Sequence, residues 1–384
     1  MNILHSSLTL RWAMPALAAA VLASCNAAQT SESTGATATA TDSMATAPAT
    51  SVATAEPKPV RPAGAKPAWG PSIAPEMQTV IEALASLNPK PIETLSAQEA
   101  RQQPTPTDAV MKVMRDHNIP TPPSSADTMS RQVMPGVKVR IYTPQNASGT
   151  LPVVVYYHGG GWVIANLDTY DASVRGLVEK TGAIVVSVAY RQGPEHKYPM
   201  AHNDSFAAYQ WVLKNAASFK GDPQKVAVAG ESAGGNLAAA VSMMARDKKV
   251  MLPRHELLVY PIAGYDLNTP SYQKNAQAKP LNKPMMAWFF ENYLRGAADG
   301  KSPLVSLVNA NLKGMPPTTI ITAELDPLMS DGSMLADKLK AAGVPTKYQN
   351  YTGVTHEFFG MAAVVPQAAQ AQELAAAELK KALQ

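Results

Sequence analysis

The sequence predicts an α/β fold in which a mainly parallel sheet is covered by helices on both faces. Short segments rich in Val and Ile alternate with helical stretches along most of the chain. One of these segments leads into a serine between glycines and another leads into three consecutive glycines, so both end in tight turns. We expect the parallel strands at 153–157, 183–188, 226–229, 257–260, 318–322 and 346–351.

Two further candidate strands precede the first parallel strand. Residues 131–134 and 137–143 flank Pro135 and Gly136, a pattern typical of a hairpin. We expect this hairpin to supply antiparallel strands at the edge of the sheet.

The first 25 residues form an export signal. The apolar segment 13–23 is too short to span a bilayer and is typical of a secretory signal. It ends in Leu-Ala-Ser-Cys, which resembles the lipid-attachment motif of bacterial lipoproteins, with Cys25 as the lipidated residue. We expect an exported protein anchored by Cys25 to a membrane of the bacterial cell envelope. The alternative is ordinary cleavage nearby, which would give a periplasmic or secreted protein.

The composition changes again after the signal. Residues 26–71 consist largely of Ala, Thr, Ser and Pro, which predicts a disordered tether. Residues 72–384 suit one α/β domain. Cys25 is the only cysteine, so no disulfide can form within the chain. The net charge of +4 over 384 residues and the lack of a basic cluster argue against nucleic acid as a partner.

The most specific motif is Gly-Glu-Ser-Ala-Gly at 230–234. It follows a predicted strand and precedes a helix-forming run, which is the context of a nucleophile elbow. Such a turn exposes the hydroxyl of Ser232, and the flanking glycines let the neighbouring backbone approach closely.

A second motif supplies what a nucleophilic serine needs. His-Gly-Gly-Gly at 158–161 follows the predicted strand 153–157. Consecutive glycines cost much backbone entropy on ordering, and an oxyanion hole requires bare N–H groups of this kind. The alternative is a flexible glycine loop.

The partners of Ser232 must follow it in the chain if the order is serine, acid, histidine. His356 lies in a loop after a predicted strand, whereas His255 begins a strand at the wrong end of the sheet. For the acid we favour Asp326, just past the strand 318–322 and before Pro327, over Glu324 and Asp331. Asp331 falls where a helix begins and is expected to cap it.

From about residue 79 to the C-terminus the chain resembles the bacterial hormone-sensitive-lipase family of esterases, which have the α/β-hydrolase fold. The motifs that carry the resemblance are HGGGW at 158–162, YRQGPEHKYPMAHND at 190–204, GESAGGN at 230–236, LDPL at 325–328 and THEFFGM at 355–361. Glu231, Gln192 and Gly193 depart from the residues most common in the family. The resemblance implies a triad of Ser232, Asp326 and His356, and an oxyanion hole formed by the N–H groups of Gly160, Gly161 and Ala233.

The resemblance also implies a helical cap over Ser232, formed by residues from about 72–125 and 265–300. Apolar residues repeat at helical spacing in both ranges. We expect Trp162, Trp288 and Phe289 to line the substrate pocket. Glu195, His196, His202 and Asp204 lack a repeated metal-ligand spacing, so we expect them to make structural hydrogen bonds before a helix at 205–219.

These observations predict a carboxylic-ester hydrolase, related to lipases, that acts on short- to medium-chain acyl esters through an acyl-enzyme and needs no metal or organic cofactor. An amidase or acyltransferase would use the same groups. A non-catalytic small-molecule receptor on this fold would keep the cavity and lose the triad histidine, which is present here. The sequence leaves the natural ester and the oligomeric state open.

Overall fold

An eight-stranded sheet forms the centre of the described structure. The computed structural model describes residues 56–124 and 126–384. The strand order is β1-β2-β4-β3-β5-β6-β7-β8, and every neighbouring pair from β4 onwards is parallel. The strands are β1 (Ala126–Met134), β2 (Val137–Pro144), β3 (Leu151–Tyr157), β4 (Ile184–Ala189), β5 (Gly221–Glu231), β6 (Glu256–Val259), β7 (Thr318–Leu325) and β8 (Thr346–Thr355). The predicted α/β fold with a mainly parallel sheet is confirmed.

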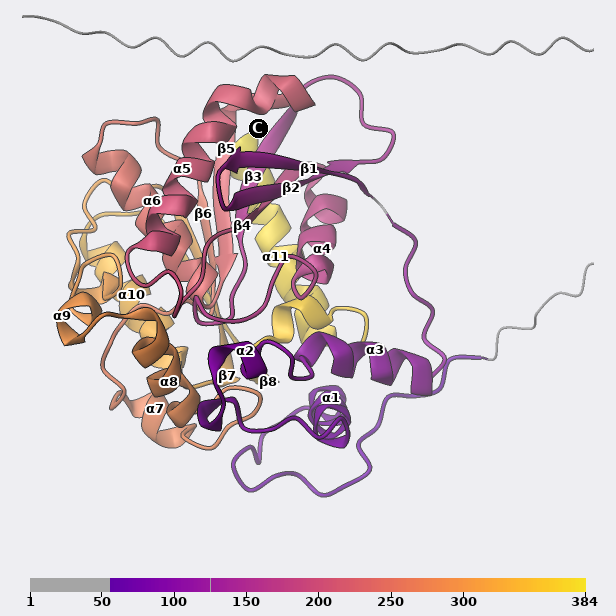
Figure 1. Cartoon of the computed structure of the whole chain (residues 1–384). Helices are drawn as coiled ribbons and strands as arrows, with labels where there is room; N and C mark the ends of the chain where they lie inside the picture. The colour runs from indigo at the N-terminus through magenta and orange to yellow at the C-terminus, as the bar shows by residue number, and fades with distance from the viewer. Residues whose placement is uncertain (1–55, 125) are drawn as a thin grey trace, which may run out of the picture. The chain divides into compact units, whose positions relative to one another are not determined.

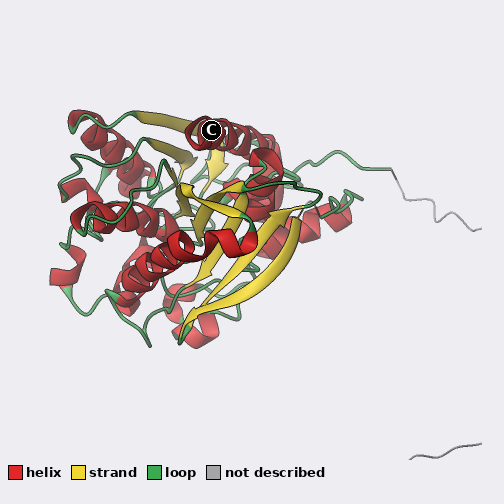
Figure 2. Ribbon diagram, turned by 90° about the horizontal axis from the view of Figure 1, so that it is seen from above, coloured by secondary structure: helices red, strands yellow, loops and turns green. Residues whose placement is uncertain are grey.

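Helices cover both faces of this sheet (Figures 1 and 2). Figure 1 shows α4 (Asp171–Thr181) and α11 (Pro366–Leu383) on one face, and α5 (Met200–Asn215), α6 (Ala233–Asp247) and α10 (Met329–Ala341) on the other. The remaining helices are α1 (Pro75–Ser86), α2 (Ala97–Ala100), α3 (Pro106–Asp116), α7 (Pro270–Lys274), α8 (Lys283–Tyr293) and α9 (Ala297–Gly300). Short 3₁₀ turns are η1 (Ile92–Thr94), η2 (Ala216–Phe219), η3 (Leu307–Asn309) and η4 (Phe358–Met361).

The sheet separates two apolar cores. Side chains alternate between the faces of a strand, so Val153, Val155 and Tyr157 of β3 enter the core beneath α5 and α6. Val154 and Tyr156 enter the core beneath α4 and α11. Because β3 is buried on both faces, it reads in the sequence as a continuous apolar run.

Differences from the predicted elements are small. The hairpin forms β1 and β2, which are antiparallel to each other, and β2 is antiparallel to β4. Helix α5 begins at Met200, earlier than the predicted 205, so His202 and Asp204 lie inside this helix and do not precede it.

The predicted tether 26–71 is too long at its C-terminal end. Within 56–71, Val60 and Trp69 pack against the core that contains α1 and α3. Glu82 of α1 accepts hydrogen bonds from the N–H groups of Ala63 and Gly64, at 2.7 and 3.1 Å. Val60, Trp69 and these two hydrogen bonds therefore attach a stretch that is polar on average.

The predicted signal segment, Cys25 and the rest of the predicted tether lie outside the described residues. Within 56–124 and 126–384, the structure has no helix with the length and apolar character needed to cross a bilayer.

The carboxyl ends of the parallel strands lie at one edge of the sheet, and the loops that follow them meet there. These loops follow β3, β5, β7 and β8 and carry, in that order, the three glycines, Ser232, Asp326 and His356. In Figure 1, α1, α2, α7 and α8 gather beside the same edge. Segments from both predicted cap ranges therefore lie beside the edge of the sheet at which these loops meet.

Candidate active site

Ser232 occupies the turn from β5 into α6. Its backbone has φ 57° and ψ −118°, which is strained for a residue with a Cβ. A Cβ on Gly230 would lie 2.1 Å from the carbonyl oxygen of Gly234, and one on Gly234 would lie 1.9 Å from that of Tyr157. The two glycines of the motif are therefore required by crowding at this turn. The Ser232 N–H donates to the carbonyl of Val259 at 2.9 Å, which fixes the turn to β6.

Ser232, His356 and Asp326 form one hydrogen-bonded chain. The Ser232 hydroxyl donates to Nε2 of His356 at 2.9 Å, and Nδ1–H of His356 donates to Oδ2 of Asp326 at 2.6 Å. All three side chains are buried. Oδ1 of Asp326 accepts the Leu328 N–H at 2.8 Å, so both carboxylate oxygens are held. The structure thus brings the three predicted residues together from the ends of three strands.

The rival acids are committed elsewhere. Glu324 lies within β7, and its carboxylate accepts the Ser72 hydroxyl and the Gly353 N–H, each at 2.9 Å. Asp331 accepts the N–H groups of Ala263 and Gly264 at 2.9 and 2.8 Å. The expectation that Asp331 caps its own helix is therefore wrong, because the loop after β6 uses its carboxylate.

His255 lies at the opposite end of the sheet from this chain of hydrogen bonds. It directly precedes β6, where its Nε2 lies 3.0 Å from the Thr319 hydroxyl.

The surroundings of His356 favour its charged form. Burial opposes the imidazolium, but the Asp326 carboxylate, together with Glu357 and Glu231, raises the pKa of His356 above its ordinary value. A raised pKa makes the imidazole a stronger base toward the serine hydroxyl.

The loop after β3 presents two glycines beside Ser232. Gly160 and Gly161 have φ values of 88° and 59°, and both line the cavity that contains Ser232. A Cβ on Gly161 would lie 2.1 Å from the Phe289 ring, so no side chain fits there. Among the backbone hydrogen bonds of residues 56–124 and 126–384, none uses the N–H groups of Gly160, Gly161 or Ala233. These are the three predicted oxyanion donors.

Side chains from outside the loop bind its carbonyl groups and hold it in place. Arg101 donates to the Val163 carbonyl at 2.8 Å, and Gln192 donates to the Ile164 carbonyl at 2.7 Å. Gln192 is one of the positions that depart from the family pattern, and here it has a structural use. The loop carbonyl groups of Val163 and Ile164 are therefore hydrogen-bonded to side chains from other segments, and no turn within the loop is needed to pair them.

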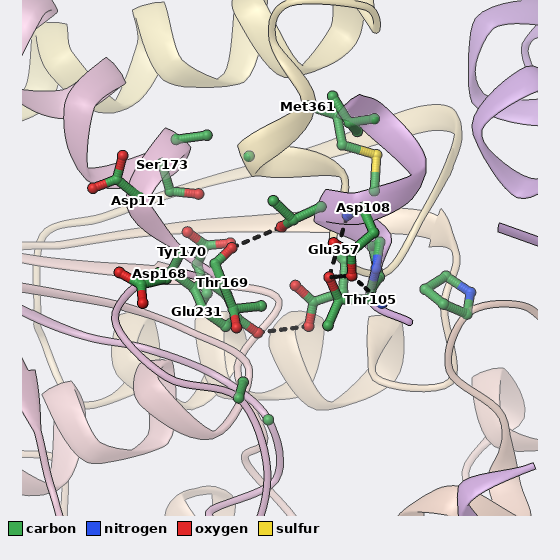
Figure 3. Close-up of a pocket in the computed structure, with 18 of the residues that line it drawn as sticks. Thr105, Asp108, Asp168, Thr169, Tyr170, Asp171, Ser173, Glu231, Glu357 and Met361 are labelled. Atoms are coloured by element: carbon green, nitrogen blue, oxygen red, sulfur yellow. Dashed lines mark hydrogen bonds between the residues drawn. The ribbon is translucent and has the colours of Figure 1, made fainter. Parts of the chain in front are cut away.

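A cavity of about 1220 Å³ opens above Ser232 and His356. Both predicted cap ranges contribute to its wall. The apolar lining includes Leu84, Ile92, Met111, Met114, Leu281, Met285 and Phe289. Polar and charged groups line another part of it, and Figure 3 shows Tyr170, Glu231 and Glu357 there.

Two of the three predicted pocket aromatics do not line this cavity. Phe289 does. The Trp162 ring is fully buried and stacks on Tyr293, with the ring centroids 4.9 Å apart. The Trp288 indole N–H donates to the Leu95 carbonyl at 3.1 Å. Adjacency in sequence to Gly161 or Phe289 does not fix the direction of a neighbouring side chain.

Three of the four polar residues singled out at 195–204 make structural contacts, whereas the His196 side chain is exposed and makes no hydrogen bond among the described residues. Arg101 pairs with Glu195 at 2.7 Å, and Arg191 pairs with Asp204 at 2.6 Å. His202 lies 2.8 Å from the Tyr293 hydroxyl, and burial lowers the pKa of this imidazole to about 4. Across 56–124 and 126–384, no cluster of three or more His, Cys, Asp or Glu side chains could hold a metal ion.

Sequence reasoning missed Glu357 and Tyr170 and noted Glu231 only as a departure from the family. The carboxylate of Glu231 accepts the hydroxyls of Tyr156 and Tyr260. Glu357 accepts the Tyr170 hydroxyl at 2.7 Å. The one available signal was position, because each acid adjoins a predicted triad residue in the chain.

Comparisons with known proteins identify relatives of this chain. Residues 154–360 match a family model described as the alpha/beta hydrolase fold. The chain is 43% identical over 251 residues to carboxylesterase NlhH of Mycobacterium tuberculosis. The aligned region covers 64% of this chain and 79% of that protein. It is 30% identical over 302 residues to an ethyl acetate hydrolase of Pseudomonas putida, covering 78% and 94% of the two chains.

Solved structures of esterases also align with most of this chain. A thermostable esterase from Pseudomonas putida aligns with a TM-score of 0.75 at 34% identity, covering 82% of this chain and 98% of that one. An esterase from the archaeon Pyrobaculum calidifontis aligns with a TM-score of 0.71 at 33% identity, covering 80% and 98%.

The buried carboxyl of Glu231 makes stability depend on pH. Burial, reinforced by the negative charge of Glu357, raises the pKa of Glu231 from 4.5 to about 7. The native state therefore binds a proton that the unfolded chain releases. The stability from this group is full below pH 4.5 and is lost as the pH rises through about 7.

We predict that Glu231→Gln, which is neutral throughout, gains stability relative to the wild type between about pH 5 and about pH 8. The gain should reach up to about 3 kcal/mol and can be measured by urea unfolding at several pH values. Glu291→Gln, an exposed change on α8, serves as the control and should run parallel to the wild type. A Glu231→Gln difference that does not vary with pH would show that Glu231 is ionised in both states.

Proposed function

Because the chain belongs to the α/β-hydrolase family and is a serine carboxylesterase of the hormone-sensitive-lipase-like group, we propose that Ser232, His356 and Asp326 carry out its ester hydrolysis. The observation that carries the proposal is the continuous hydrogen-bonded chain from the Ser232 hydroxyl through His356 to Asp326. This chain opens onto a cavity large enough for an ester.

In the first half of the reaction, Ser232 attacks the carbonyl carbon of the ester. Nε2 of His356 takes the serine proton as the new C–O bond forms, and Asp326 stabilises the resulting imidazolium. The imidazolium then gives that proton to the leaving alcohol as the ester C–O bond breaks, which leaves an acyl group on Ser232.

The oxyanion of each tetrahedral intermediate needs donors that are already in place. We assign this role to the N–H groups of Gly160, Gly161 and Ala233. Each such donor is worth about 3 kcal/mol of transition-state stabilisation. The support for this assignment is that none of the three N–H groups is used by the described backbone hydrogen bonds.

In the second half, water attacks the acyl carbon and gives a proton to Nε2 of His356. The bond to Ser232 then breaks, and the proton returns to the serine oxygen as the carboxylic acid leaves. The apolar wall that includes Met285 and Phe289 suits acyl groups of short to medium length.

The acid is tested by comparing two carboxylates. Asp326→Asn should lower kcat by about 10⁴-fold, because the amide holds the wrong imidazole tautomer, with little change in KM. Glu324→Gln should change kcat little, because Glu324 binds Ser72 and Gly353 outside the cavity. Steady-state hydrolysis of p-nitrophenyl esters of graded acyl length measures both parameters and the acyl preference together. The opposite ranking of the two variants would move the acid to Glu324.

We also propose that the chain is exported and that a lipid on Cys25 attaches it to a membrane of the cell envelope. The support is the short apolar segment at 13–23 followed by Leu-Ala-Ser-Cys. A lipoprotein carries at least two acyl chains, which is the number that stable attachment requires.

Cys25→Ser should abolish incorporation of labelled fatty acid and block processing of the signal, because serine offers no thiol to the lipid. Esterase activity per molecule should be unchanged, since Cys25 lies far in the chain from every triad residue. Metabolic labelling and fractionation of expressing cells provide the measurement. Recovery of unlabelled wild type in the soluble fraction would favour a periplasmic or secreted enzyme.

A further inference from the structure

Glu357 lies beside the hydrogen-bonded chain formed by Ser232, His356 and Asp326. It follows His356 directly, between β8 and η4, with φ 69°. This left-handed residue ends the run of the strand, and the side chain lines the same cavity as Ser232 and His356. Its Oε1 lies 3.9 Å from Nε2 of His356, the nitrogen that receives the proton.

One oxygen of Glu357 is fixed by the protein. Oε1 accepts the Tyr170 hydroxyl at 2.7 Å. Tyr170 reaches this position because residue 159 is glycine, where a Cβ would lie 2.2 Å from the Tyr170 hydroxyl oxygen. Among the hydrogen bonds of the described residues none is made by Oε2, and the Glu357 side chain is 20% exposed. Oε2 can therefore accept a hydrogen bond from a molecule in the cavity.

The carboxylate of Glu231, the other acid beside Ser232 and His356, has both oxygens hydrogen-bonded. Glu231 is 1% exposed, and its two oxygens accept the hydroxyls of Tyr156 and Tyr260. Of the two acids beside Ser232 and His356, Glu357 alone has an oxygen free to bind a small molecule.

We propose that Glu357 is a positioning residue that holds the attacking water during hydrolysis of the acyl-enzyme. The inference rests on the proposed function of Ser232 and His356. The Glu357 carboxylate approaches Nε2 of His356 to 3.9 Å at Oε1, and Oε2, which makes no hydrogen bond within the described residues, belongs to the same carboxylate. We therefore place the water between Nε2 of His356 and Oε2 of Glu357.

The water uses its two O–H bonds differently in this arrangement. One O–H donates to Nε2 of His356, and this proton moves to the imidazole as the oxygen bonds to the acyl carbon. The other O–H donates to the Glu357 carboxylate and stays on the oxygen. Glu357 gains and loses no proton, and the product is the free acid with the Ser232 hydroxyl restored.

An alcohol cannot make both contacts. Methanol has one O–H, which must face Nε2 of His356 for methanol to act as a nucleophile. Glu357 therefore favours water over methanol as the acceptor of the acyl group. Any effect of the Glu357 charge on the imidazolium applies to both acceptors and cancels in the ratio of their products.

Glu357→Gln should reverse the polarity of the free position. The Tyr170 hydroxyl needs an acceptor, so the amide oxygen takes the place of Oε1 and the NH₂ group faces the cavity. Water then meets a donor where it needs an acceptor.

The experiment measures product partition with p-nitrophenyl acetate in a fixed concentration of methanol. We expect Glu357→Gln to raise the ratio of methyl acetate to acetic acid about tenfold, the effect of losing one hydrogen bond to a charged group. Glu324→Gln is the matched control, because its side chain is also 20% exposed and lies outside the cavity. Its ratio should equal that of the wild type.

Glu357→Asn provides a second variant, because asparagine tolerates a positive φ and is too short to reach the water. It should raise the ratio as well if Glu357→Gln fails to fold. A wild-type ratio in the folded Glu357 variants would overturn the role of Glu357 and leave the proposed function intact. If Ser232→Ala hydrolysed p-nitrophenyl acetate at the wild-type rate, the proposed function itself would be contradicted.

Discussion

The strained turn at Ser232 is the constraint on which the site depends. Its left-handed backbone is tolerated because Gly230 and Gly234 leave no Cβ between β5, α6 and β3. The turn places the hydroxyl at the edge of the sheet where the loops after β7 and β8 also end. Hydrogen bonds from this hydroxyl to His356 and on to Asp326 then require no further rearrangement of the backbone.

The carboxyl groups around His356 are the second feature on which the site depends. Asp326 binds Nδ1, Glu357 lies 3.9 Å from Nε2, and the charge of Glu231 also acts on the pKa of the imidazole. Three carboxyls beside one imidazole would repel one another if all were ionised, and burial raises the pKa of both Glu231 and Glu357. Tyrosine hydroxyls bind both oxygens of Glu231 and one oxygen of Glu357, so the site keeps these acids near a base without exposing them fully to solvent.

The sequence predicted those features that depend on backbone geometry and chain order. Glycine runs and the order of Ser232, Asp326 and His356 locate tight turns at strand ends, and the structure brings those residues together. Their catalytic roles stay predictions. The lining of the cavity was predicted poorly, because the direction of Trp162 and Trp288 depends on packing against distant segments. The end of the tether was missed because Trp69 packs against the core that contains α1 and α3, a contact that no local pattern reveals.

In the proposed reaction, Ser232 carries the acyl group of the ester between the two half-reactions. A fluorophosphonate reacts with a serine that is activated in this way, and mass spectrometry of the digested protein locates the adduct. The account predicts one adduct per chain, on Ser232, with loss of esterase activity in proportion to labelling. An adduct on another residue, or full activity after complete labelling of Ser232, would contradict it.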